Sequence, residues 1–329
     1  MNEKFSVIIP LYNKGPHIAR AVESILRQTL QNFEIIVVDD QSSDEGPVIV
    51  KSYHDPRISL IKQDHRGVAH TRNYGVSLAT ADVIAFLDAD DEWMPHHLET
   101  ILRLIKKYPD AGMFATAFKI RTAEGKTIWG DYQYIPPPPW EGLLPDFFRS
   151  GALGHDPVNS SVVVIPRKIF YEMGGFHEDH WFGEDSYLFG KIALKYPVAF
   201  SWECGAIYHQ EALNRACNKK FPRNYEQPFV KTARVALMKG EVQPDLVESV
   251  NEFITKREIY RCYWNLQEGN LETAHTILKQ CTTKLRINEK RRLLILIKLK
   301  LLIKAILPSP VFLFLRDSKR NVMNLVIKK

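Results

Sequence analysis

Two acidic groups follow apolar runs within the first hundred residues. Asp39–Asp40 come directly after Ile35–Val38, and Asp88–Asp91 come after Val83–Leu87. Short runs this rich in β-branched residues are typical of strands buried on both faces, as in a parallel sheet. Ligands bind such sheets beyond the carboxyl ends of the strands, so both groups should face one crevice. Because several carboxylates in one crevice repel each other, we expect a divalent metal ion there, carrying a diphosphate.

Asp88 and Asp90 have a spacing that suits a metal ion. Residues two apart in an extended segment point the same way, so both carboxylates can face one ion and its ligand. Hard cations such as Mn²⁺ or Mg²⁺ take oxygen ligands and keep positions open for phosphate oxygens. Taken alone, the acidic group is also compatible with a solvated turn.

Further side chains at the same edge could contact a nucleotide. Tyr12 follows the first strand and could stack on a base, and Lys14 could face phosphate. Asp40 lies in the next loop, where its carboxylate could accept a hydrogen bond from the ring N–H of uracil. The alternatives are packing for the tyrosine and a turn-forming role for Asp40, which precedes Gln41–Asp44.

Strand and helix signals alternate over the first hundred residues. The expected strands cover residues 5–10, 33–39, 58–63 and 83–88, and the expected helices cover 18–26, a short crossover before 58, 67–80 and a helix opened by 93–95. This alternation predicts an α/β fold with a mostly parallel sheet flanked by helices. His96 and His97, near the start of the last helix, are expected on the surface.

The expected secondary structure changes after Gly112. Extended segments there include a hairpin signal at Glu124–Gly125 and one more buried strand at 158–165. Beyond Asn224 the pattern is helical and suggests an αα-hairpin around 263–270. We therefore expect three parts, which are a catalytic domain over residues 1–220, a helical region over 221–286 and a basic amphipathic tail over 287–329.

A series of motifs in this order resembles family 2 glycosyltransferases. The motifs are Ser6–Asn13, Val37–Asp44, Arg72–Gly75, Asp88–Asp91, Gly174–Phe176 and Glu184–Asp185. The resemblance covers residues 4–215. It implies a Rossmann-like GT-A fold, a nucleotide-diphosphate sugar donor, a divalent metal ion and inversion at the anomeric carbon.

The resemblance also implies donor-binding roles. It places Tyr12 and Asp40 at the nucleobase, Arg72 at the diphosphate or its supporting network, and Asp88 at the ribose or the sugar. His65 stands where the family often has asparagine, which leaves the identity of the donor open. The other residues expected at the donor are Pro10, Asn13 and His209. The alternative for His209 is a histidine at a strand end whose hydrogen bonds are satisfied within the protein.

The metal and the base are assigned in the same way. Asp90 would hold the metal, with Asp91 as a helper, and Asp185 matches the general base with Glu184 beside it. A sugar hydroxyl that attacks the anomeric carbon needs one carboxylate to take its proton. An acidic pair at a helix N-terminus is the alternative for Glu184 and Asp185.

Residues 177–180 have the composition of a metal site but not its spacing. His177, Glu178, Asp179 and His180 fit neither a helix-borne HExxH motif nor a Cys/His zinc site. We expect them to form a loop on the acceptor side instead.

The positive charge of the chain is concentrated at its C-terminal end. The formal net charge is +6, yet thirteen basic and only two acidic residues lie between Lys284 and Lys329. The catalytic part is mildly acidic, so we expect no nucleic-acid partner. Lysines interrupt the apolar run Arg291–Leu307, which favours an interfacial membrane anchor over a spanning helix, with packing on protein as the alternative. The N-terminus lacks an apolar signal segment and the four cysteines lack CxxC spacing, so we expect a cytoplasmic protein on the inner membrane face.

These features together predict an inverting, metal-dependent glycosyltransferase. A UDP-sugar is the favoured donor, and a hydroxyl of a glycan or lipid-linked acceptor in surface polysaccharide synthesis is the expected acceptor. One alternative is a polyprenyl-phosphate sugar synthase of the same fold. Another is a catalytically silent, membrane-tethered protein that binds nucleotide sugars. A dinucleotide oxidoreductase is disfavoured because no GxGxxG motif follows the first strand.

Overall fold

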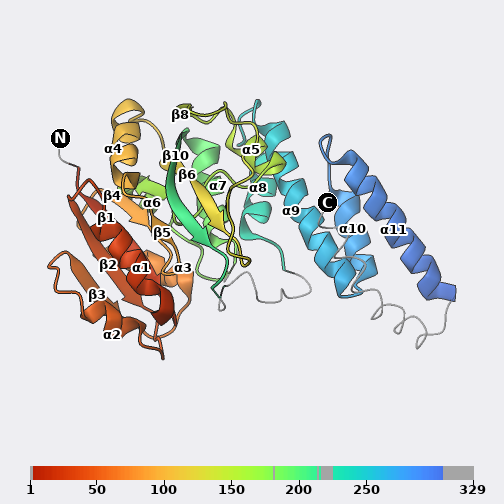
Figure 1. Ribbon diagram of the computed structural model, residues 1–329. Coiled ribbons are helices and arrows are strands. Elements are labelled where there is room, and N and C mark those ends of the chain that lie inside the picture. Colours follow the sequence, from red (N-terminus) through yellow and green to blue (C-terminus); the bar gives the residue numbers. More distant parts are fainter. Residues whose placement is uncertain (1–2, 181, 213–214, 216–224, 307–329) are drawn as a thin grey trace. The chain divides into compact units, whose positions relative to one another are not determined.

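The computed structural model describes residues 3–180, 182–212, 215 and 225–306 (Figure 1). The chain divides into two compact units. The first consists of Met1–Lys219 and Gln227–Gln243, and the second of Lys220–Glu226 and Pro244–Lys329. The first unit contains the sheet, and the second is helical (Figure 1).

Four parallel strands form one half of the sheet, in the order β3–β2–β1–β4. They are β1 (Phe5–Leu11), β2 (Phe33–Asp39), β3 (Ile58–Lys62) and β4 (Val83–Phe86). β1 lies between β2 and β4 and is almost entirely buried, as its apolar run predicts. Because β1 is parallel to both β2 and β4, the loops after these three strands share one edge of the sheet. The acidic groups lie at the end of β2 and in the loop after β4.

The other half of the sheet mixes strand directions. It continues from β4 through β9 (Val163–Pro166), β6 (Met113–Arg121), β10 (Val198–His209) and β5 (Glu92–Trp93). β9 is antiparallel to both β4 and β6, whereas β10 is parallel to β6. β7 (Thr127–Trp129) and β8 (Glu141–Leu143) pair with β6 and β10. Within the described residues, ten strands thus form one mixed sheet.

Helices flank this sheet in the first unit. The crossovers between the parallel strands are α1 (Gly15–Leu26), α2 (Gly46–Lys51) and α3 (Val68–Leu78). α3 lies close to β1 because Gly75 has no side chain, and a Cβ there would be 2.4 Å from Cγ2 of Ile8. The expected α/β fold with a helix-flanked sheet is confirmed.

Five more helices complete the first unit. They are α4 (His97–Lys107), α5 (Phe147–Leu153), α6 (Arg167–Glu172), α7 (Glu184–Lys195) and α8 (Pro228–Lys239). α7 and α8 pack tightly, since a Cβ on Gly190 would lie 2.4 Å from the ring of Phe229. α8 therefore belongs with the sheet, although it lies beyond the boundary expected at residue 220.

Two expectations for residues 93–97 are wrong. Glu92–Trp93 does not open a helix but pairs with β10 as a short strand, and α4 begins at His97. His97 is not on the surface but 1% exposed, with its ring centroid 4.6 Å from that of Trp93. Gly205 leaves room for it, because a Cβ there would lie 2.3 Å from Nδ1 of His97. Burial lowers the pKa of His97 to about 3, so this imidazole is neutral.

The second unit is built from three helices in the described residues. α9 (Val247–Gln267) and α10 (Leu271–Gln280) form the expected αα-hairpin, and α11 (Ile287–Ile306) follows. Their apolar side chains form one core, which includes Ile259, Leu266, Ile277, Leu278, Leu293 and Ile297. The expected helical C-terminal extension is confirmed.

α11 covers the first part of the expected basic tail. Leu293 and Ile297 are buried in the core of the second unit, so one face of the helix packs on protein. On another face Ile295, Leu299 and Leu302 are 59%, 53% and 57% exposed. No helix in the described part of the chain is both long and apolar enough to cross a membrane. The tail after residue 306 lies outside the described residues.

Candidate active site

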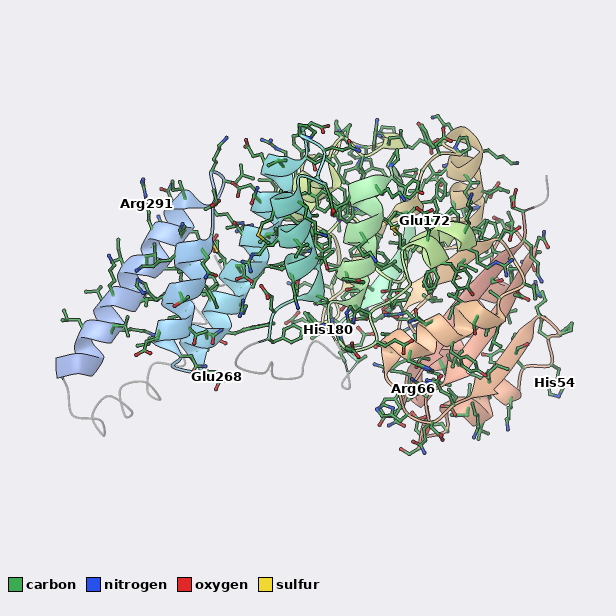
Figure 2. All side chains as sticks on the ribbon, turned by 180° about the vertical axis from the view of Figure 1, so that it is seen from behind. His54, Arg66, Glu172, His180, Glu268 and Arg291 are labelled. Carbon is green, nitrogen blue, oxygen red and sulfur yellow. The ribbon has the colours of Figure 1, made fainter. Side chains whose placement is uncertain are left out.

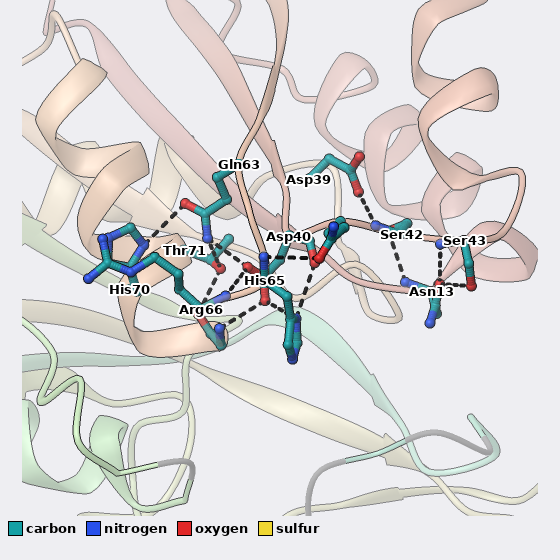
Figure 3. Close-up of polar contacts among 12 residues, drawn as sticks. Asn13, Asp39, Asp40, Ser42, Ser43, Gln63, His65, Arg66, His70 and Thr71 are labelled. Carbon is teal, nitrogen blue, oxygen red and sulfur yellow. Dashed lines mark hydrogen bonds and ion pairs between the residues drawn. The ribbon is translucent and has the colours of Figure 1, made fainter.

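Asp40 is buried. Its carboxylate accepts hydrogen bonds from the loop that precedes α3 (Figure 3). Its Oδ1 accepts hydrogen bonds from the Gln63 amide at 2.7 Å and the Arg66 backbone N–H at 2.8 Å. Its Oδ2 accepts from the Gly67 N–H at 2.9 Å and lies 2.9 Å from Nδ1 of His65. A carboxylate has about four lone-pair sites. Asp40 therefore orders this loop, and a uracil N–H would have to share one of its oxygens.

Tyr12 and His65 form an aromatic pair beside the same loop. Their ring centroids are 4.4 Å apart with planes at 30°, and Tyr12 is 43% exposed. An exposed aromatic ring held by a partner suits stacking on a planar base. Tyr12 thus lies at the carboxyl end of β1, beside the loop that Asp40 orders.

Asn13 joins the loop after β1 to the loop after β2 (Figure 3). Its φ of 51° is left-handed, a conformation that asparagine adopts more readily than most residues. Its Oδ1 accepts a hydrogen bond from the Ser43 N–H at 2.8 Å, and its own N–H donates to Oγ of Ser42 at 3.0 Å. Asn13 therefore shapes the loop, while Pro10 lies just before it, half-buried in β1.

Asp90 already binds a cation, the ammonium group of Lys14. Nζ of Lys14 lies 2.6 Å from Oδ2 of Asp90, and the two side chains are only 13% and 14% exposed. The guanidinium of Arg20 donates to the backbone carbonyl of Asp90. Within the described residues, no group of three or more His, Cys, Asp or Glu side chains is placed to hold a metal ion. A divalent ion at Asp90 would take further ligands from phosphate oxygens and water, as Mg²⁺ commonly does, and this one carboxylate fits that mode.

Asp91 supports the acidic loop from the inside. It is 1% exposed, and its carboxylate accepts hydrogen bonds from Oγ of Ser161 and from the His209 backbone N–H at 2.9 Å. Burial, followed by the charges of Asp90 and Asp88, raises the pKa of Asp91. Both of its oxygens face protein donors, so Asp90 is better placed than Asp91 to bind an ion.

Arg72 connects the acidic loop to α7. Its Nη2 lies 2.6 Å from Oδ1 of Asp88, and its Nη1 lies 2.8 Å from Oε1 of Glu184. The guanidinium also lies over the ring of Phe176, 5.2 Å from its centroid. Burial lowers the pKa of Arg72, but the charges of Asp88 and Glu184 raise it overall, so the guanidinium stays protonated. One buried cation therefore holds two of the predicted site carboxylates together.

Glu184 and Asp185 are the first two residues of α7, and each lies close to other carboxylates. Burial and the charge of Asp185 raise the pKa of Glu184 to about 7. Burial also raises the pKa of Asp185, and the charges of Asp156 and Asp88 add to this effect. Oδ1 of Asp185 accepts a hydrogen bond from the Ser186 N–H at 2.6 Å. A carboxylate with a raised pKa is a stronger base, and Asp185 has this property.

We expect Glu184→Gln to change how stability depends on pH. A glutamate is protonated below its ordinary pKa of 4.5 in both the folded and the unfolded chain. As the pH rises from 4.5 to about 7, only the unfolded chain loses this proton, so stability falls over that range. Glutamine cannot ionise, and the variant should therefore gain stability relative to the parent between pH 4.5 and 7. Urea unfolding at several pH values tests this, with the exposed Glu272→Gln as control. A constant difference between variant and parent would contradict it.

Asn73 is a site residue whose role the sequence did not reveal. Its Nδ2 donates to the Phe176 carbonyl and its Oδ1 accepts from the Phe176 N–H, both at 2.9 Å. Its Nδ2 also lies 2.9 Å from Oε1 of Glu178. Gly175 has a φ of 68°, and a Cβ there would lie 2.8 Å from Oδ1 of Asn73. The motifs Arg72–Gly75 and Gly174–Phe176 thus form one structural unit that positions the chain leading into α7.

His209 is buried at the end of β10 and bound by two carboxylates. Its Nδ1 lies 2.7 Å from Oε1 of Glu211, and its Nε2 lies 3.0 Å from Oε1 of Glu92. Its backbone N–H donates to Asp91, so His209 adjoins the acidic loop. Neither Glu92 nor Glu211 was among the predicted site residues. Only the folded chain brings Glu92 to this ring, whereas Glu211 lies two residues from His209 in the sequence.

A mixed, mostly parallel sheet flanked by helices, with an acidic loop after β4 and the acidic pair Glu184–Asp185 at the start of α7 in the same unit, is the arrangement expected of a GT-A glycosyltransferase. The chain belongs to glycosyl transferase family 2, whose sequence profile matches residues 6–216. This confirms the family resemblance of the motifs and the prediction of an enzyme.

Named relatives agree with this assignment. The chain is 28% identical over 301 residues to the uncharacterized glycosyltransferase YibD of Escherichia coli K12, covering 85% of this chain and 84% of YibD. It is 38% identical over 113 residues to the amylovoran biosynthesis glycosyltransferase AmsB of Erwinia amylovora, covering 33% of this chain and 38% of AmsB.

A solved structure shows the same fold. The crystal structure of S. aureus TarS 1-349 in complex with UDP-GlcNAc aligns with a TM-score of 0.69 and 16% sequence identity. The alignment covers 85% of this chain and 82% of the TarS chain. The GT-A fold expected from the sequence is thereby confirmed.

Proposed function

We propose that this glycosyltransferase moves a sugar from a UDP-sugar to a hydroxyl of a glycan or lipid-linked acceptor, with inversion at the anomeric carbon. The observation that carries the proposal is the buried Arg72, which binds Asp88 on one side and Glu184 on the other. It joins the acidic loop after β4 to the helix that begins with the expected base. A donor at the acidic loop and an acceptor beside α7 would then meet at this junction.

The donor is proposed to lie along the edge formed by β1, β2 and β4. Tyr12 would stack on uracil, and the loop ordered by Asp40 would border the base. Pro10 and Asn13 would shape the floor of this subsite, and His209 would support the acidic loop near the diphosphate. The UDP-GlcNAc bound to TarS, a protein of the same fold, supports a UDP-sugar as the donor class.

Asp90 is proposed to hold Mn²⁺ or Mg²⁺, with Asp91 supporting the loop behind it. When bound, such an ion would neutralise the negative charge that develops on the departing diphosphate. Asp90 already pairs with the ammonium of Lys14, which shows that its carboxylate is oriented toward a cation. The Lys14 ammonium would be free to meet a phosphate oxygen once Asp90 binds the ion.

Asp185 is proposed as the base that takes the proton from the acceptor hydroxyl. Its half-buried carboxylate and raised pKa suit the abstraction of a proton. Glu184 would contribute by positioning Arg72, because its Oε1 lies 2.8 Å from Nη1 of the guanidinium. Attack from the face opposite the diphosphate would then give inversion.

A panel of nucleotide sugars tests the proposal. We expect a UDP-sugar to raise the melting temperature of the enzyme in the presence of Mn²⁺, because a ligand that binds only the folded state stabilises it. Asp90→Asn should remove the part of this increase that depends on metal, whereas the exposed Asp110→Asn should not. An equal increase in EDTA and in Mn²⁺ would contradict the metal role. No increase with any UDP-sugar would contradict the donor class.

α11 supports the proposal that the enzyme works on the inner face of the membrane. Ile295, Leu299 and Leu302 are exposed and lie three or four residues apart, so they share one face of the helix. The exposed basic side chains of Arg291, Arg292 and Lys298 flank this face and would contact anionic headgroups. A lipid-linked acceptor would then lie within reach of the enzyme.

We expect the full chain to float with vesicles that contain anionic lipid. Replacing Leu299 and Leu302 by glutamate should abolish flotation, because acidic side chains do not enter the acyl boundary of a membrane with anionic headgroups. Met238→Glu changes an exposed apolar residue of α8 and serves as the control. Equal flotation of the double variant and the parent would contradict the proposal that this face of α11 binds the membrane.

A further inference from the structure

A pocket of about 390 Å³ lies beside α7 and α8 in the first unit. Its walls include residues of the loop before α7 and of both helices, among them His177, His180, Tyr187, Lys231 and Thr232. Figure 2 labels His180, which lies in the loop between α6 and α7. Tyr187 follows the expected base Asp185 by two residues in α7. The pocket is therefore built partly from the helix that carries the base.

Three aromatic rings form one wall of this pocket. The ring of His177 lies 4.6 Å from that of His180 at 73° and 5.0 Å from that of Tyr187 at 81°. Nζ of Lys191 lies 5.0 Å from the centroid of Tyr187. These edge-to-face contacts hold two imidazoles in the wall of the pocket, and an imidazole ring carries an N–H donor.

Lys231 brings a positive charge to the lining of the pocket. Burial, followed by the charge of His177, lowers the pKa of His180, and Lys231 lowers it as well, while Asp179 raises it. A lowered pKa favours the neutral imidazole, which still carries one N–H donor. Glu241 also lines the pocket, but its carboxylate lies 3.7 Å from Nζ of Lys239, which offsets its charge. An oxyanion in the pocket would receive hydrogen bonds from the imidazoles and an ion pair from Lys231.

We propose that this pocket is an acceptor subsite for an oxyanion, a phosphate or carboxylate carried by the acceptor glycan. The inference rests on the proposed transferase function and extends it to the chemistry of the acceptor. The donor residues lie along the edge of β1, β2 and β4, whereas this pocket shares α7 with the base. Lys231 and the imidazoles of His177 and His180 would hold the anionic group while a neighbouring hydroxyl reaches Asp185.

NMR of the full chain without a histidine tag tests the subsite directly. The imidazole C–H signals of His177 and His180 are assigned with His177→Gln and His180→Gln variants. We expect glucose 6-phosphate or glucuronate to shift both signals, and glucose to leave them unchanged. A response to only one of the two anions tells which oxyanion the pocket accepts. No shift with either anion, or equal shifts with glucose, would overturn the proposal.

Lys231→Gln adds a second readout. The variant should bind the responding anion at least about fivefold more weakly and should bind UDP as the parent does. Lys106→Gln, a change of an exposed lysine in α4, should affect neither ligand. Unchanged anion binding in Lys231→Gln, or a parallel loss of UDP binding, would contradict the subsite. A parent that binds the anion but no UDP-sugar would instead overturn the proposed function, so the two failures are distinguishable.

Discussion

Asp185→Asn should lower the rate of sugar transfer by about 10²–10⁴-fold, which is what general-base catalysis typically contributes. An amide cannot accept the proton of the acceptor hydroxyl, yet it keeps the size of the side chain and can still accept the 2.6 Å hydrogen bond from the Ser186 N–H. The binding of UDP should therefore change little. Transfer is measured as release of UDP in the presence of acceptor, and UDP binding by calorimetry.

The control for this substitution is Asp110→Asn. The Asp110 side chain is exposed in the turn between α4 and β6, so its loss should leave transfer intact. Full activity of Asp185→Asn would contradict the role as base that we propose for Asp185. It would favour a lipid phosphate as the acceptor, because a phosphate oxygen attacks without a strong base.

Arg72→Met should destabilise the first unit by about 3–5 kcal/mol, the usual cost of removing one partner of a buried ion pair. The side chain of Arg72 is 4% exposed, and its loss leaves Asp88 and the buried Glu184 without their common cation. The raised pKa of Glu184 should rise further without that cation. Transfer should fall as well, because the acidic loop and α7 lose the contact that joins them.

Two comparisons separate this effect from a general loss of charge. Arg57→Met removes a more exposed pair with Asp55 and should cost only about 0–1 kcal/mol. Adding Glu184→Gln to Arg72→Met should recover part of the stability, since it removes one unpaired carboxylate. Urea unfolding of the four proteins tests both statements. An equal loss of unfolding free energy in Arg72→Met and Arg57→Met would contradict the inference that Arg72 holds Asp88 and Glu184 together.

The parallel strands could be predicted because their burial leaves a local signal. β1, β2 and β4 are covered on both faces, so their sequences are continuous apolar runs. The αα-hairpin of the second unit is equally local, since its helices meet at the turn that contains Gly269. The acidic loops could be placed at one edge because strand direction and order determine where the loops emerge.

Contacts between distant residues could not be predicted in this way. His97 is buried only because Gly205, more than a hundred residues later, leaves room for its ring. The pairing of Lys14 with Asp90 and the hydrogen bonds between Asn73 and Phe176 likewise depend on the assembled sheet. The sequence named Asp40, Asp88 and Glu184 as site residues, but their partners became visible only in the fold.

The most direct test is the position of manganese and UDP in crystals soaked with both. Anomalous scattering at the manganese edge should give a peak within coordination distance of the Asp90 carboxylate. The uracil should lie against Tyr12, beside the loop that Asp40 orders. The Asp185 carboxylate should face the diphosphate across the site. A manganese peak or a uracil ring bound away from these residues would contradict the account.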